Sequence, residues 1–239
     1  MMGKKWLLWT LLLGLLILVG VYLIYRYVCF LGGRTPQVIR FLRHPEDYPR
    51  LILPAGTRCD DAPFALPSRG MIGFVWGDSF RPGHRHSGID IFSGKAVGEE
   101  PVYAAYDGYL TRLVEWKASV IIRIPSDPLQ PETQVWTYYT HLADRFGNTL
   151  ISDHFPPGTS EVFVTAGTLL GYQGNYSGTF GKPTGIHLHF SIVRDDGKGQ
   201  FLNELDIGNT LDPSPYFGLQ LNARENKDQI PLCAPPWGS

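Results

Sequence analysis

The run Ile186-His-Leu-His-Phe-Ser-Ile-Val193 decides how the chain folds. Side chains two apart on a β-strand face the same way, so Leu188 and Phe190 point towards a core. His187 and His189 then lie side by side on the opposite, polar face of the strand. Two imidazoles placed like this can contact one ion and one reacting group. A solvated pair of histidines on a sheet face would show the same spacing.

Short strand patterns recur on both sides of this run, separated by turn residues. The 239-residue chain contains 27 Gly, 19 Pro, 12 Tyr and 13 Phe, a composition more typical of strands and turns than of helices. Strands are predicted at 71–76, 102–105, 109–116, 120–124, 134–141, 162–164, 168–172 and 186–193. No long helical period is seen beyond the N-terminus. The sequence therefore predicts an all-β fold, an antiparallel sandwich or small open barrel.

A second histidine cluster, His84-Arg-His86-Ser-Gly88-Ile-Asp90, lies about a hundred residues earlier. On a straight strand His86 and Asp90 would be about 13 Å apart, too far to share an ion. Gly88 permits a bulge or bend that aims both side chains inward. A carboxylate between the apolar residues Ile89 and Ile91 would be costly without a partner.

Together the two clusters supply histidine and aspartate ligands from distant strands. Nitrogen and oxygen ligands of this kind suit Zn²⁺, and three protein ligands leave a fourth position for water, as in catalytic zinc sites. His141 ends another predicted strand, 134–141, in which alternation places it on the same face as Tyr139. A lone histidine there would more often be a surface or core residue.

These motifs, in this order, resemble the lysostaphin/LytM-type zinc endopeptidases, which have the duplicated hybrid motif fold. The resemblance covers about residues 70–195 and rests on His86-Ser-Gly-Ile-Asp90, Pro101-Val-Tyr-Ala-Ala-Tyr-Asp-Gly108, Tyr139-Thr-His-Leu142, Gly167-Thr-Leu-Leu-Gly171 and His187-Leu-His189. It implies that His86, Asp90 and His189 bind zinc. It also implies that His141 and His187 flank the reacting water, one as general base and one near the oxyanion.

Three features depart from the family pattern. The loops 92–100 and 175–184 are longer than usual and are expected to line the substrate groove, so substrate preference does not carry over. His84 is an additional histidine beside His86, interpreted as solvated or as a neighbour of a ligand.

The first thirty residues form a separate unit. Residues 6–25 carry no charge, and a helix of that length rises about 30 Å, the thickness of a bilayer core. An uncleaved anchor is predicted, with a cleaved signal or a buried helix as alternatives. Lys4 and Lys5 favour a cytoplasmic N-terminus, whereas Arg26, Arg34 and later arginines oppose it, so charge alone does not decide orientation.

The predicted organisation has four parts: a membrane anchor (1–30), a linker (31–67), a zinc peptidase domain (68–218) and a proline-rich tail (219–239). Cys59 and Cys233 flank the domain and would pair if it is exported, or else remain two unrelated thiols.

The resemblance implies hydrolysis of peptide bonds in the stem or cross-link peptides of peptidoglycan, which requires the domain outside the cytoplasm on a single-pass anchor. A net charge of -1, with no long run of one sign, gives no reason to expect nucleic acid. The alternatives are a non-catalytic, wall-binding or amidase-activating relative, a cupin-type oxygenase using His84, His86 and Asp90, and a phosphocarrier domain of sugar transport.

Overall fold

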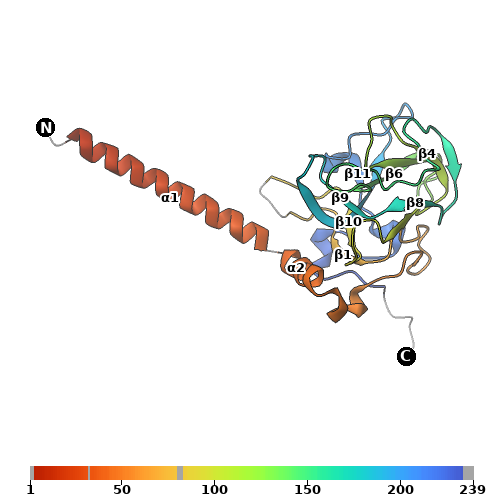
Figure 1. The fold of residues 1–239 in the computed structure, drawn as a ribbon, viewed down its shortest axis with the longest axis horizontal. Coiled ribbons are helices and arrows are strands. Elements are labelled where there is room, and N and C mark those ends of the chain that lie inside the picture. The colour runs from red at the N-terminus through yellow and green to blue at the C-terminus, as the bar shows by residue number, and fades with distance from the viewer. Residues whose placement is uncertain (1–2, 32, 80–82, 234–239) are drawn as a thin grey trace.

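A long N-terminal helix projects away from a β-rich body. The computed structural model describes residues 3–31, 33–79 and 83–233. Helix α1 (Gly3–Leu31) stands clear of the rest of the protein in Figure 1. Its stretch Leu8–Tyr25 has a mean hydropathy of 2.4 and none of it is buried. By length and composition this helix can cross a membrane, as residues 6–25 predict.

The body is built on one large antiparallel sheet. Its strands run in the order β1-β2-β10-β6-β5-β4-β7, with β9 and β11 also paired to β10, and a separate pair joins β3 to β8. The strands are β1 (Met71–Phe74), β2 (Ile89–Phe92), β3 (Pro101–Tyr103), β4 (Gly108–Thr111), β5 (Val120–Ile124), β6 (Val135–Thr140), β7 (Val162–Val164), β8 (Leu169–Tyr172), β9 (Gly174–Tyr176), β10 (Pro183–Arg194) and β11 (Thr210–Leu211). The predicted all-β antiparallel fold is confirmed.

Strand β10 divides the molecule into a core side and a groove side. Leu188, Phe190 and Ile192 are fully buried in the main hydrophobic core. His187 and His189 alternate with them and line a groove on the opposite face. Because side chains alternate between the two faces of a strand, successive residues of β10 face the core and the groove in turn.

Strand β2 was not among the predicted strands. All four of its residues are buried, so it shows no alternation between a wet and a dry face. A short run buried on both faces gives no periodic signal. The strand forms because its backbone pairs with β1 on one side and with β10 on the other.

The segment 31–67 contains structure that the sequence did not predict. Helix α2 (Thr35–Arg43) begins with Pro36 in its first turn and packs Val38 and Phe41 against Met71 and Phe92. Two 3-10 turns follow, Pro45–Asp47 and Pro49–Leu51. Nine residues give barely more than two turns, too short for a convincing helical period.

The C-terminal segment also packs on the body. Short helices α3 (Ser214–Phe217) and α4 (Ala223–Asn226) follow a third 3-10 turn, Ile207–Asn209. Leu219 and Leu221 belong to the main core. Cys59 and Cys233 form a disulfide with a Cα–Cα distance of 5.3 Å. The domain boundaries remain predictions, and residues 234–239 of the predicted tail lie outside the described residues.

Candidate metal centre

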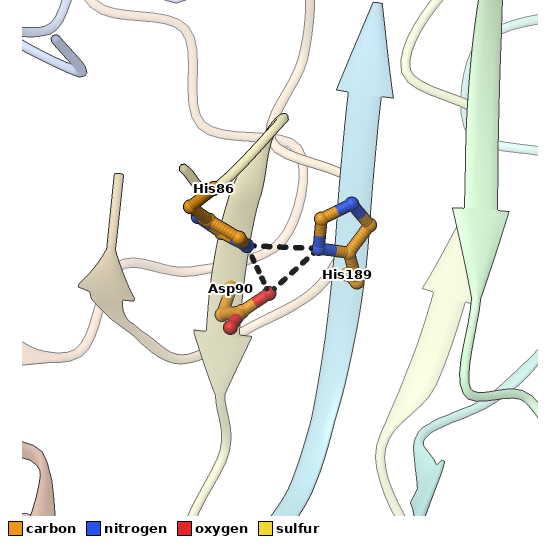
Figure 2. Close-up of side chains that lie close together, drawn as sticks. All are labelled: His86, Asp90 and His189. Carbon is orange, nitrogen blue, oxygen red and sulfur yellow. Dashed lines mark hydrogen bonds and ion pairs between the residues drawn. The ribbon is translucent and has the colours of Figure 1, made fainter. Parts of the chain in front are cut away.

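Three predicted ligands meet at one point. The Nε2 atom of His86 lies 3.0 Å from Oδ1 of Asp90 and 3.0 Å from Nδ1 of His189, and the third edge of this triangle is 2.9 Å. Figure 2 shows the three side chains converging from the β2 region and from β10. All three residues are buried.

Two features of the fold hold this triangle: the register of β2 with β10, and the close approach of the Gly88 backbone to the Phe190 carbonyl oxygen. Asp90 and His189 are paired directly across β2 and β10. His86 precedes β2, and the chain bends at Gly88 before the strand begins. A Cβ atom at Gly88 would lie 2.1 Å from the carbonyl oxygen of Phe190, which no real side chain allows. Glycine is therefore required for His86 and Asp90 to reach the same point.

A hydrogen bond outside the triangle orients His86, and an acidic side chain faces His189. Nδ1 of His86 lies 3.1 Å from the carbonyl oxygen of Val75, to which it can only donate, so the lone pair on Nε2 faces the triangle. Nε2 of His189 lies 3.6 Å from Oε2 of Glu204, close enough for an ion pair but not for a hydrogen bond, and this oxygen accepts a hydrogen bond from Ser87. The sequence analysis missed Glu204, because an isolated acid with no neighbouring motif gives no signal.

The donor set fits a zinc ion. Atoms 2.9–3.0 Å apart can all lie about 2.0 Å from one common point, which is the usual zinc–nitrogen and zinc–oxygen distance. Burial alone would raise the pKa of Asp90, but His86, His187 and His189 hold it well below its usual range. Burial would lower the pKa of His189, yet Asp90 and Glu204 raise it to about 10. The point between these groups thus favours positive charge.

His141 and His187 form a second pair in the same groove, with ring centroids 4.4 Å apart. Each points its Nδ1 at a backbone carbonyl oxygen, that of Tyr176 for His141 and that of Gly185 for His187, both at 2.7 Å. These bonds leave Nε2 of each ring as an acceptor. Nε2 of His187 lies 3.6 Å from Oδ1 of Asp90, which places this ring beside the triangle.

Both histidines of the second pair are held neutral. Burial, reinforced by the neighbouring His187, lowers the pKa of His141 to about 3. Burial also lowers the pKa of His187, although Asp90 opposes the shift. A neutral imidazole with a free Nε2 is the form that can take a proton.

The backbone at His141 departs from the expected strand alternation. Alternation places His141 on the face of Tyr139, and Tyr139 lies in the main core. That assignment of the face is wrong, because β6 ends at Thr140 and His141 adopts a φ of +70°, which turns its side chain into the groove. Positive φ is uncommon for a residue with a Cβ, and such strain clusters at functional sites.

The groove around both groups has a volume of about 820 Å³. Tyr176, Ser177, Gly178 and Thr184 of the predicted loop 175–184 line it, as expected. The predicted loop 92–100 contributes only Phe92, which belongs to strand β2, and none of residues 93–100 is among the lining residues, so the expectation for that loop is not met. Other lining residues come from helix α2 and the opposite wall, among them Thr35, Val38, Ile39, Leu42, Trp116, Lys117 and Tyr138. His84 also lines the groove but is not part of the triangle.

Comparison with known proteins gives structural matches and no sequence-level ones. No family model matches the chain, and no curated protein matches it. Twenty solved chains match in structure. They include lysostaphin (23% identity, 62% of this chain and 49% of that one, TM-score 0.38). Another is a variant of the catalytic domain of the prophage-encoded M23 protein EnpA from Enterococcus faecalis. It is 21% identical, and the match covers 62% of this chain and 95% of that one with a TM-score of 0.36.

A further match is a lytM protein from Ruminococcus gnavus, described as a glycyl-glycine endopeptidase (25% identity, 54% of this chain and 44% of that one, TM-score 0.36). The chain spans less than half the length of this protein and of lysostaphin. Such partial overlap leaves the functional conclusion to the site itself. The resemblance to lysostaphin/LytM-type proteins, first seen in the order of the motifs, is found again in the search of solved structures.

Proposed function

We propose that this protein is a membrane-anchored zinc metallopeptidase that hydrolyses peptide bonds in the stem or cross-link peptides of peptidoglycan. One observation supports this most: a buried His86-Asp90-His189 triangle shares a groove with two neutral histidines, His141 and His187. A structural zinc site would have no use for a second pair of acceptors beside it.

We infer the roles of these residues from the positions of their side chains. When bound by His86, Asp90 and His189, zinc lowers the pKa of water to about 7 and polarises a carbonyl group. His141 and His187 carry Nδ1–H bonds to backbone carbonyls, so their Nε2 atoms are free to accept a proton from water in the groove. The protonated ring can pass that proton to the leaving amine. The other ring accepts at Nε2 in its neutral form, so it would have to take up a proton before it could donate to the developing oxyanion.

The substrate and the location are argued from the groove and from α1. An open groove of about 820 Å³ accepts an extended peptide, and peptidoglycan peptides lie outside the cytoplasmic membrane. We therefore infer a single span with the body on the extracytoplasmic side. The Cys59–Cys233 disulfide supports this side, because disulfides persist in oxidising compartments.

Digestion of purified peptidoglycan by the detergent-solubilised full chain tests the proposal, with product masses identifying the bond cut. We expect new amino and carboxyl termini in the peptide fraction, and none with the Asp90→Ala variant. Intact peptidoglycan after incubation with the zinc-loaded wild-type protein would contradict the proposal and favour a wall-binding, non-catalytic role.

A further inference from the structure

Arg34 is a buried arginine at the junction between the anchor and the body. It lies at the start of α2, three residues after α1 ends, and only 1% of it is exposed. An arginine in that position would ordinarily be expected at the membrane surface, in contact with water or lipid head groups. Burying its charge requires a partner.

The partner is Asp78. Nη1 of Arg34 lies 2.8 Å and 2.9 Å from the two carboxylate oxygens of Asp78. The remaining donors of Arg34 reach the side chain of Asn226 and, at 3.2 Å, the carbonyl oxygen of Gln229. Arg34 therefore ties α2, the Asp78 turn and the C-terminal segment together.

Asp78 in turn shapes the loop that orients a metal ligand. Its Oδ2 accepts the backbone N–H of Val75 at 2.8 Å, and its own N–H donates to the Val75 carbonyl at 3.1 Å. Gly77, with φ +86°, makes this a tight turn. The same Val75 carbonyl receives the Nδ1–H of His86, and the Asp78 carbonyl receives the His86 backbone N–H at 2.8 Å.

We propose that Arg34 is a positioning residue for the metal centre, acting through Asp78 and the Val75 carbonyl on the ring of His86. This rests on the metal site of the proposed function. Outer hydrogen-bond partners of metal ligands fix ring orientation and tautomer, and their loss typically costs about 10–100-fold in metal affinity. The segment that joins the anchor to the body then supports the metal site from outside, so removing residues before 68 removes that support.

The test compares variants of the full chain for zinc affinity, by competition with a chelator, and for thermal unfolding of the metal-stripped protein. Arg34→Lys keeps the charge but loses the paired contact, and Arg40→Lys, on the exposed face of the same helix, is the matched control. We expect zinc affinity to fall about tenfold or more in Arg34→Lys and in Asp78→Asn, and to stay unchanged in the control. The visible absorption of bound Co²⁺ should change in the same two variants.

A double variant separates positioning from stability. Arg34→Met with Asp78→Leu removes both charges, and apolar replacement of a buried ion pair is often neutral or stabilising. We expect this protein to unfold near the wild-type temperature while its zinc affinity stays low, because the Val75 N–H has lost its acceptor. Zinc affinity that returns together with stability would overturn the proposal, as would unchanged affinity in Arg34→Lys and Asp78→Asn. Failure of the wild type to cut peptidoglycan would instead count against the proposed function alone.

Discussion

The two halves of the groove hold their histidines in different ways. In the metal half, His86, Asp90 and His189 lie within 3.0 Å of one another, backed by Val75, Asp78 and Glu204. In the other half, His141 and His187 each hydrogen-bond to one backbone carbonyl oxygen, and their rings contact each other. The first half concentrates negative charge and attracts a cation; the second excludes charge and stays neutral.

This difference arises between side chains on one face of the sheet. Asp90 lies inside the first group, and its Oδ1 is 2.9 Å from His189 but 3.6 Å from His187. Two histidines separated by two residues on β10 thus have opposite pKa shifts, upward for His189 and downward for His187. The distances to the carboxylates, and not the residue type, give the two histidines opposite pKa shifts.

Breaking the metal half should have the largest effect. Asp90→Ala removes the carboxylate corner of the triangle and its negative charge, so we expect zinc binding and hydrolysis to be lost together. His86→Ala and His189→Ala should behave alike. Metal content of the purified proteins and peptide-release rates on the same preparations measure this. Zinc retained in His86→Ala but lost in His84→Ala would mean that the ligand register is wrong.

Breaking the other half should separate binding from chemistry. His141→Asn removes the imidazole but tolerates positive φ, and His187→Gln keeps a similar size. Each should keep one zinc per chain and lose about 10²–10⁴-fold in turnover, the usual contribution of a general acid–base group. The double variant should lose less than the product of the single losses. Normal turnover in His141→Asn would show that His141 takes no part in hydrolysis and is only a residue at the end of a strand.

The support of His189 should have a smaller effect. Glu204 faces Nε2 of His189 from 3.6 Å, so Glu204→Ala should weaken zinc binding about 10–100-fold, while Glu204→Gln, which still offers an acceptor, should weaken it less. Chelator competition measures both. Glu115→Ala, another carboxylate lining the groove, is the control. Equal affinities in all of these proteins would leave Glu204 without a role at the metal.

The neutral state of His141 should appear as a pH dependence of the free energy of unfolding, without any change at the metal site. Its pKa is about 3 in the folded protein, against 6.5 for the unperturbed side chain. Between these values the unfolded chain binds a proton that the folded protein does not, so His141 destabilises the fold as pH falls from 6.5 towards 3. Urea unfolding of metal-stripped protein should show a shallower acid loss in His141→Asn, on the order of a few kcal/mol. Parallel curves for the two proteins would show that His141 is not held neutral in the folded protein.

Much of the site was predictable because its residues carry strong local signals. The alternation around Leu188 and Phe190 placed two histidines on one polar face, and the order of the motifs selected His86, Asp90 and His189. Gly88 marked the bend that brings His86 to Asp90. Residues that act only through three-dimensional contacts, such as Arg34, Asp78 and Glu204, carry no such signal.

By itself, the sequence determined the all-β class, the apolar N-terminal helix and the candidate ligands, because hydrophobic period and motif spacing are properties of neighbouring residues. Only the tertiary structure decided that residues of α2 line the groove, that Arg34 is buried against Asp78, and that His141 turns away from the core. Each of these depends on which distant segments pack together. A side chain's charge state, exposure and partner are set by that packing, which no local pattern encodes.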